Sequence, residues 1–255
     1  MRNVFDISIF NTEDSTRYFL AVVKKLWQQC STATASLFYC YIGHLAQQDR
    51  LVRQYSQNVD WIENQLFSLS TARNVQTRNS KRNSSRMQIK EPWLSTIYLY
   101  SRLDLMRCQK CSALFFTIAE LLQDLFLPLY SVCYKVNECR LIQRKRVLSL
   151  GRLRPDILLY GEKSLNQNAI ERVCANDIRA RSNAVLVVGT KLNIPEAKRL
   201  AIELYQSIRA SSIERATIWI SKNLSPSTHQ HLFDVVLIED CDNIVGIDVF
   251  DNTEN

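Results

Sequence analysis

The sequence predicts an α/β protein built on a doubly wound parallel sheet, with flanking helices and a small cysteine-bearing lobe. Two observations lead to this prediction. In the C-terminal half, short apolar runs of the strand type alternate with segments whose apolar residues recur at helical spacing. Between Cys108 and Cys139, two pairs of cysteines interrupt that alternation. At 255 residues and 46% hydrophobic content, the chain is long enough for one enzyme-sized unit.

The N-terminal half is predicted to begin with two helices. From Asp14 to Cys30 apolar residues recur at helical spacing, with Asp14 or Ser15 available as the N-cap. Ser36 to Gln47 shows a second helical pattern. Leu51 to Tyr55 is predicted as a short strand that runs into a polar cluster, and open α/β sheets place ligands at the carboxyl ends of their strands.

Beyond Gly151 the alternation becomes regular. The continuous apolar run from Ala184 to Val188 is typical of a parallel strand that is covered on both faces. The other elements predicted here are strands at Asp156–Tyr160, Thr217–Ile220 and Val235–Ile238, a helix at Ala169–Ala180, and a second helix that begins at Pro195.

Composition and charge indicate a soluble intracellular protein. No apolar run is long enough to span a membrane, and residues 1–6 do not resemble a secretory signal. The net charge of +7 would suit an acidic partner such as chromatin. A predicted loop over residues 64–92 fits two interpretations, a solvated flexible segment or one that contacts DNA or directs nuclear import; its bases are Arg73, Arg78, Lys81, Arg82, Arg86 and Lys90.

The spacing of the cysteines favours a metal site. Cys108 and Cys111 have the two-residue spacing that lets both thiolates face one ion, and Cys133 and Cys139 follow about 20 residues later. Four thiolates would make a closed structural zinc site that does no chemistry. Because five residues separate the second pair, unrelated buried thiols remain the alternative. The predicted core cysteines are Cys30, Cys40 and Cys174.

Four segments of the sequence form an ordered set of motifs: RLVRQYSQNVD at residues 50–60, GRLRPDILLYGE at 151–162, AVLVVGTKLNIP at 184–195, and DCD at 240–242. Together they resemble the sirtuin family, NAD-dependent protein deacylases, in its fungal nuclear histone-deacetylating branch. The resemblance runs in order from residue 5 to residue 245. It implies one deacetylase domain over residues 1–250 with a tail at 251–255, a zinc-binding module at 100–150, and an incomplete Rossmann-like sheet. It further implies NAD, structural zinc, an acetylated histone peptide as partner, and a nuclear or otherwise cytoplasmic location.

The resemblance also assigns candidate roles to individual residues. Gln57, Asn58 and Asp60 would surround nicotinamide and its ribose, Gly189 and Thr190 would lie along NAD, and Cys241 would touch adenine. A flanking strand would pair with the acyl-lysine peptide, through Ile157, Leu158, Tyr160, Gly161 and Glu162. Considered alone, the same residues suit turn caps, a strand-to-helix connection and a core thiol, so those alternatives stay open.

Two departures from the family pattern predict impaired activity. The chain has no glycine turn of the GAGIS type, which in sirtuins approaches the pyrophosphate, so NAD binding is expected to be weak or lost. Tyr100 and Ser101 stand where the family has the catalytic histidine and a glycine. A phenol with a pKa near 10 is a poor base at pH 7. The three histidines, His44, His229 and His231, offer no substitute, and further cofactor-side departures are Trp61, Lys191 and Ser221.

The leading hypothesis from the sequence is therefore an NAD-dependent histone lysine deacetylase by family, impaired in this chain. The alternative is a non-catalytic, zinc-stabilised module that binds NAD or chromatin.

Overall fold

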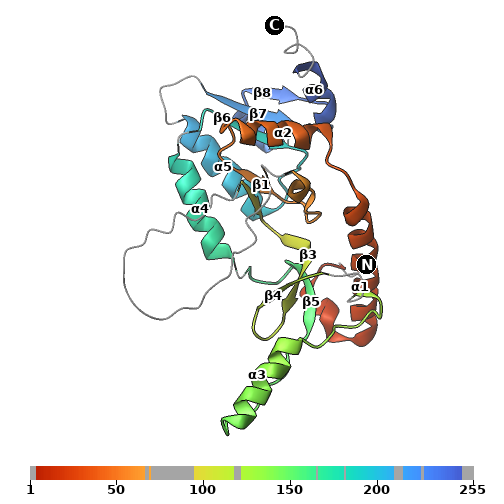
Figure 1. Cartoon of the computed structure of the whole chain (residues 1–255). Helices are drawn as coiled ribbons and strands as arrows, with labels where there is room; N and C mark the ends of the chain where they lie inside the picture. The colour runs from red at the N-terminus through yellow and green to blue at the C-terminus, as the bar shows by residue number, and fades with distance from the viewer. Residues whose placement is uncertain are drawn as a thin grey trace. The chain divides into compact units, whose positions relative to one another are not determined.

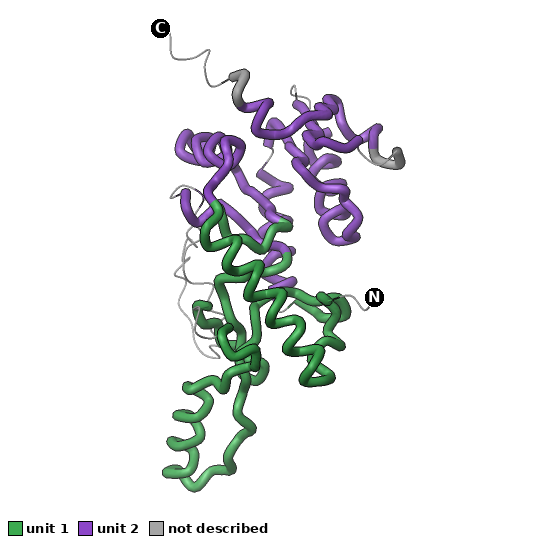
Figure 2. The backbone as a smooth tube through the Cα atoms, turned by 90° about the vertical axis from the view of Figure 1, so that its right-hand side faces the viewer, with its two compact units in different colours: residues 1–33, 57–62, 100–165 green, residues 34–56, 63–99, 166–255 purple. Residues whose placement is uncertain are grey.

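The computed structural model describes residues 4–66, 69, 95–117, 122–164, 166–180, 182–209, 215–224 and 227–248. The predicted basic segment from Arg73 to Lys90 lies outside these residues. The chain forms two compact units, shown in green and purple in Figure 2. Unit 1 comprises residues 1–33, 57–62 and 100–165, and unit 2 comprises residues 34–56, 63–99 and 166–255. None of the helices in the described ranges combines the length and the apolar character needed to cross a membrane.

Unit 1 is built around a three-stranded antiparallel sheet with the order β4-β3-β5. The strands are β3 (Ser101–Cys108), β4 (Leu114–Phe116) and β5 (Leu153–Ile157). The predicted strand at Asp156–Tyr160 is thus displaced towards the N-terminus and belongs to this antiparallel sheet. Apart from an isolated bridge at Tyr160, the segment after Ile157 forms a turn and leaves the ladder.

Helix α1 (Glu13–Thr32) buries one face against this sheet (Figure 1). Phe19, Leu20 and Val23 recur at helical spacing and form a core with residues that include Leu103 and Ile157. The expected N-cap is wrong: Thr12 accepts the backbone N–H of Ser15, and Glu13 and Asp14 occupy the first turn, where the helix dipole favours acids. The short helix η1 (Ile7–Asn11) precedes α1.

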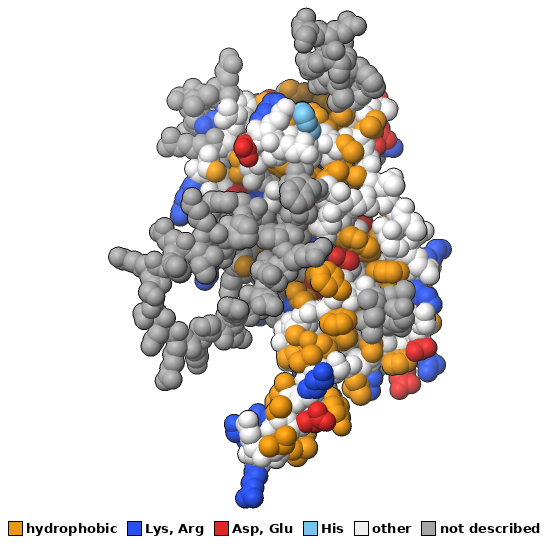
Figure 3. Space-filling model, viewed as in Figure 1, with side chains coloured by type: hydrophobic (Ala, Val, Ile, Leu, Met, Phe, Trp, Pro, Cys, Tyr) orange, Lys and Arg blue, Asp and Glu red, His pale blue; other side chains and the backbone are white. Residues whose placement is uncertain are grey.

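The cysteine-bearing insert of unit 1 carries a second small core and a mostly exposed helix. Met106, Cys108, Tyr130 and Leu153 form this core, and α3 (Ser131–Ile142) extends from it (Figure 1). Many large apolar side chains of the insert remain exposed, and Figure 3 shows hydrophobic side chains gathered on its visible face. They include Leu114, Phe115, Phe116, Phe126, Leu129, Val132 and Tyr134.

Unit 2 contains the predicted parallel sheet, with the order β6-β7-β8. Its strands are β6 (Ala184–Val188), β7 (Ala216–Ile220) and β8 (Val235–Leu237), all parallel. Helices α4 (Gln167–Arg179) and α5 (Pro195–Arg209) confirm the alternation, and α5 packs on β6 (Figure 1). Val187, Leu192 and Trp219 form the local core.

The rest of unit 2 comprises shorter pieces. The second predicted helix is α2 (Leu37–Gln47), which packs on α6 (Cys241–Asp248). Strands β1 (Gln54–Ser56) and β2 (Thr96–Tyr98) form a separate parallel pair. The short helices η2 (Ile62–Gln65) and η4 (Ser227–Leu232) complete the described elements.

Strand β6 is less covered than the sequence predicts. It lies at one edge of the described three-stranded sheet, and both Ala184 and Leu186 are exposed. The apolar run therefore correctly predicted the strand and its parallel direction. The prediction that both faces of the strand are covered is wrong for the residues that the structure describes. An apolar strand at a sheet edge offers its backbone to another strand.

Candidate functional site

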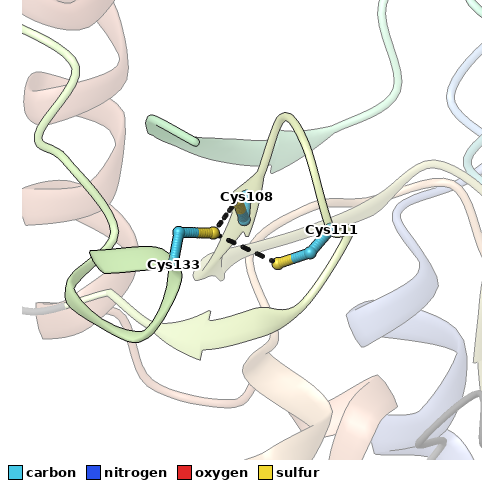
Figure 4. A group of neighbouring side chains, drawn as sticks. All are labelled: Cys108, Cys111 and Cys133. Atoms are coloured by element: carbon cyan, nitrogen blue, oxygen red, sulfur yellow. Dashed lines mark hydrogen bonds between the residues drawn. The ribbon is translucent and has the colours of Figure 1, made fainter. Parts of the chain in front are cut away.

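Three of the four predicted metal ligands come together at the insert of unit 1. The Sγ atoms of Cys108, Cys111 and Cys133 all lie within 4.8 Å of one another, as Figure 4 shows. The Sγ of Cys133 is 3.7 Å from that of Cys108 and 3.8 Å from that of Cys111. Four sulfurs around a zinc ion at about 2.3 Å lie roughly 3.8 Å apart, so the spacing fits a tetrahedral ion.

The backbone around the cluster explains why these three thiols meet. Cys108 ends β3, and the N–H of Ser112 donates to the Cys108 carbonyl to close a tight turn, with Ser112 in the left-handed region at φ 57°. Cys133 lies in the first turn of α3, where its N–H donates to the carbonyl of Tyr130. The carbonyl of Gly151 accepts the N–H of Tyr130, so Gly151 connects the start of α3 to the strand that follows.

The pKa values of two thiols in the cluster are shifted in opposite directions. Burial opposes ionisation of Cys108, but backbone N–H groups of Cys111 and Lys110 outweigh it and lower the Cys108 pKa. Burial, together with the neighbouring thiols, raises the pKa of Cys133 to about 11. A metal cation would displace these protons, because the thiolate is the form that binds.

The remaining cysteines lie apart from the cluster. Cys139 is exposed on α3, and it is not among the thiols that the structure groups. Of the predicted core cysteines, Cys174 is buried and Cys30 is half-buried, whereas Cys40 is exposed, so the core assignment of Cys40 is wrong.

Tyr100 lies beside residues from two of the predicted site segments. Its hydroxyl is 3.4 Å from the Nε2 of Gln57, and its carbonyl accepts the N–H of Leu158 at 3.1 Å. Ser101 pairs with Ile157 in the sheet. Unit 1 thus places the tyrosine between a residue that the resemblance assigns to the cofactor and a strand that it assigns to the substrate.

The backbone of the predicted peptide-binding strand is already engaged within unit 1. The N–H of Tyr160 donates to the carbonyl of Phe5, and its carbonyl accepts the N–H of Ile7. The N–H of Leu159 donates to Glu162, whose carboxylate also pairs with Arg154. Gly161 forms the turn at φ 82°. A peptide that pairs as an added strand would have to compete with these contacts at residues 158–160.

Two ion pairs involve residues of β5 and of the predicted peptide-binding segment. Arg107 pairs with Asp156 at 2.5 Å, and Arg154 pairs with Glu162. Burial raises the pKa of Asp156, and the charge and hydrogen bond of Arg107 oppose that shift. These four side chains line one small cavity together with Ile157, Leu158, Ser101, Lys163 and Ser164. Sequence reasoning missed these pairs because charged residues in a strand are ordinarily expected to face water.

Asp60 follows the same segment as Gln57 and the exposed Asn58, and its carboxylate is half-buried. Burial raises the pKa of Asp60, while the backbone N–H groups of Ile62 and of Asp60 itself lower it less. Its negative charge also contributes, after burial, to the raised pKa of Cys30. A carboxylate held in this way is stabilised poorly by the described protein groups.

Asp60→Asn is expected to stabilise the protein at neutral pH. The folded pKa of Asp60 lies above its unfolded value, so the folded state binds the proton more tightly and loses stability as pH rises through this range. The gain in unfolding free energy should therefore be present at pH 7 and nearly absent at about pH 4, near the ordinary pKa of aspartate. Urea unfolding at the two values measures it, and a gain that is larger in acid would contradict the assignment.

Ser101 has a backbone conformation that suits glycine. Its φ is 68°, in the left-handed region, where a side chain costs roughly 1–2 kcal/mol. The family's preference for glycine at this position thus has a conformational reason. Trp61, another departure from the family pattern, has φ 48° and packs against the α1 core.

Ser101→Gly is accordingly expected to raise the unfolding free energy by about 1 kcal/mol. The matched control is Ser95→Gly, since Ser95 is not among the residues with positive φ and should lose up to about 1 kcal/mol on gaining backbone freedom. Urea unfolding of both variants checks the prediction, and equal losses at the two positions would refute it.

The candidate cofactor residues of unit 2 share one edge of the parallel sheet. Gly189 and Thr190 follow β6, Ser221 follows β7, and Cys241 comes after β8 at the start of α6. Gly189 has φ 62° and open space around it, because an added Cβ would meet nothing within 4 Å. Burial raises the pKa of Cys241, and Asp242 and Asp240 add to the shift. The carboxyl edge of a parallel sheet is the usual ligand position in α/β folds.

The two histidines whose side chains the structure describes are both exposed. His44 is exposed on α2 beside Gln48, and His231 is exposed in η4. The side chain of His229 lies outside the described part of the structure.

A protein-family model described as the Sir2 family matches residues 2–195 of the chain. The NAD-dependent protein deacetylase hst4 of Emericella nidulans is 31% identical over 96% of the chain, and hst4 of Schizosaccharomyces pombe is 28% identical over 92%. The NAD-dependent histone deacetylase HST3 of Candida albicans is 28% identical over 96%. The chain spans 39%, 54% and 50% of these three relatives.

Solved structures confirm the fold. A Sir2 in complex with an inhibitor, 2′-O-acetyl-ADP-ribose and a deacetylated p53 peptide has a TM-score of 0.66 at 16% identity, covering 97% of this chain and 84% of that one. A Sir2 mutant with tyrosine in place of a histidine, described with a p53 peptide and NAD, has a TM-score of 0.61 at 16% identity. It covers 97% of this chain and 82% of that one.

Proposed function

The chain belongs to the Sir2 family, and on that premise we propose that it binds NAD and an acetylated histone-type peptide and deacetylates it slowly. The observation that carries this proposal is the position of Tyr100 in unit 1. Its hydroxyl faces Gln57 at 3.4 Å, and its carbonyl holds the N–H of Leu158. Tyr100 thus contacts one segment that the resemblance assigns to the cofactor and one that it assigns to the substrate.

The residues that would hold NAD are of the kinds that fit it. Gln57 and Asn58 offer amides for a ribose or a carboxamide, and the carboxylate of Asp60 receives little stabilisation from the residues that the structure describes. In unit 2, the open space around Gly189 lets a ligand approach the backbone. When bound, NAD would supply the ribose carbon that accepts the acyl oxygen, with nicotinamide as the leaving group.

Tyr100 sets the rate in this proposal. A base must take a proton from a ribose hydroxyl, and an ordinary phenol, with a pKa near 10, is almost wholly protonated at pH 7. Tyr100 can still donate a hydrogen bond and fill the place beside Gln57. Binding is therefore expected to persist while proton transfer slows.

Nicotinamide release from NAD in the presence of an acetylated histone peptide tests the proposal on the full 255-residue chain. Turnover is expected to be lower than that of hst4 from Schizosaccharomyces pombe by on the order of 100-fold, the usual contribution of a positioned base. Calorimetric titration with NAD should show binding, weak because the sequence has no glycine turn of the GAGIS type. Turnover equal to the relative would refute the slow step, and undetectable NAD binding would refute the cofactor.

A structural zinc ion in unit 1 is part of the same proposal. Cys108, Cys111 and Cys133 present soft sulfur ligands at the spacing that zinc requires. The ion would hold β3, α3 and Gly151 together and would take no part in the reaction.

A second candidate, a non-catalytic interaction module, is favoured by the exposed apolar side chains of the insert. Leu114, Phe115 and Phe116 are all exposed along β4, and exposed apolar patches often mark binding surfaces (Figure 3). Bound zinc without NAD binding would support this candidate.

We further propose the nucleus as its location, since histones are the substrates named for its relatives. Fluorescence microscopy of the tagged chain would test it. Contact with chromatin through the basic segment remains part of this proposal, and loss of chromatin association after neutralising Arg73 to Lys90 would support it.

A further inference from the structure

The cluster of unit 1 supplies three sulfurs to an ion that takes four ligands. The Sγ of Cys133 lies at the separation of a tetrahedral site from those of Cys108 and Cys111, and all three atoms lie within 4.8 Å of one another. Among the described His, Cys, Asp and Glu residues, no fourth joins this group. The fourth ligand is therefore either Cys139 or a molecule from solvent.

Helix α3 holds Cys139 away from the cluster. Cys133 lies in its first turn, and six residues of α-helix rise about 9 Å and turn through roughly 240° beyond one revolution. Cys139 is consequently displaced along the helix and around it, on an exposed face. A sulfur that shares the ion with Cys133 must lie at about 3.8 Å from it.

The distal part of α3 is locked in place. The buried side chain of Asn137 donates to the carbonyl of Leu148 at 2.7 Å and accepts the N–H of Leu148 at 3.0 Å. The Nε of Arg140 donates to the carbonyl of Arg146 at 2.8 Å. Bringing Cys139 to the ion would unwind the helix after Cys133 and break these bonds, leaving the buried amide of Asn137 without its partner.

The cluster is also open on one side. Cys111 is exposed and Cys133 is half-buried, whereas Cys108 is fully buried. A corner at the exposed side is within reach of water or of a small ligand from solution.

We propose that the metal site of this chain has three protein thiolates, with the fourth position open to solvent and filled by water, and that Cys139 is not a ligand. The proposal rests on the zinc site proposed above and is independent of deacetylation. Open tetrahedral sites bind exchangeable ligands, unlike the closed four-thiolate sites that are purely structural.

X-ray absorption spectroscopy of the zinc-loaded full-length chain tests the ligand set directly. Three sulfurs at about 2.3 Å and one lighter atom at about 2.0 Å are expected. A fit with four sulfurs would overturn the proposal. A chain that binds no zinc would instead remove the zinc site itself, so the two failures are distinguishable.

Two exposed cysteines of the same unit provide a matched pair of variants. Cys139→Ser should retain about one zinc per chain, whereas Cys111→Ser should lose it, because only Cys111 lies in the cluster. Equal loss of zinc from the two variants would contradict the proposal. Circular dichroism distinguishes loss of zinc from loss of the fold, and the absorption spectrum of the unsubstituted chain decides the matter if either variant unfolds.

A small thiol serves as the probe of whether the fourth coordination position is open to solvent. Cobalt(II) in place of zinc should show visible absorption bands that shift saturably as a monothiol is added, because a fourth sulfur replaces the water. Spectra that do not change at high thiol concentration would show a closed site, against the proposal.

Discussion

Gly151→Ala is expected to abolish zinc binding and to lower the unfolding free energy by about 3 kcal/mol or more. A Cβ at this position would lie 2.1 Å from the Sγ of Cys108 and 3.3 Å from that of Cys133. The first distance is far inside van der Waals contact, so the sulfur of Cys108 would have to leave its place in the cluster. Metal analysis of the purified chain and urea unfolding measure the two effects.

Gly189→Ala provides the control for this substitution. There a Cβ meets nothing within 4 Å, and the positive φ of 62° should cost only about 1 kcal/mol. The control variant should keep its zinc. Full zinc occupancy in Gly151→Ala would show that the cluster can rearrange around a methyl group, contrary to the geometry.

Asp177→Ala is expected to lower the unfolding free energy by about 3–5 kcal/mol, the usual cost of removing one member of a buried ion pair. Asp177 lies on α4, and both of its oxygens accept from Arg53, at 2.9 and 3.1 Å. The hydroxyl of Tyr55 donates to it at 2.5 Å. The side chains of Arg53 and Asp177 are 5% and 4% exposed, so the substitution leaves a buried guanidinium without its carboxylate.

Glu171→Ala on the same helix is the matched control. Its pair with Arg199 spans 3.7 Å between side chains that are 47% and 62% exposed, so its loss should change stability by less than about 0.5 kcal/mol. Replacing both Arg53 and Asp177 with leucine or methionine should recover much of the loss. Urea unfolding of the three variants completes the comparison, and equal effects of Asp177→Ala and Glu171→Ala would refute the buried pair.

The parallel half of the fold could be predicted from the sequence because its signals are local. The apolar run at Ala184–Val188 and the stripe that begins at Pro195 mark β6 and α5 with nearly the observed bounds. The antiparallel strand β5 was displaced in the prediction. Its buried Asp156 pairs with Arg107, 49 residues earlier in the chain, and its buried Arg154 pairs with Glu162; such pairs leave no periodic signal.

Some features of the candidate site could be predicted from the sequence, and others could not. Residue spacing identified Cys108 and Cys111, and the structure brings Cys133 to them. The position of Cys139 depends on how far α3 continues. The buried side chain of Asn137 holds that part of the helix through its bonds to Leu148, eleven residues further along the chain. The strain at Ser101 is a property of φ, and only the backbone reveals it. The roles of Gln57, Asp60, Gly189 and Cys241 remain predictions that the proposed binding experiments address.

The assembly of unit 1 from three separate segments has a consequence for synthesis of the chain. Phe19 and Leu20 of α1 bury against Leu103, Ile157 and Leu159, the last of which follows Phe19 by 140 residues. At a translation rate of about 5–20 residues per second, roughly 7–30 s pass between synthesis of these α1 residues and synthesis of Leu159, their last partner in this core. During this interval the apolar residues of α1 lack their packing partners and remain exposed. The nascent chain is therefore the form of this protein most exposed to chaperones and proteases.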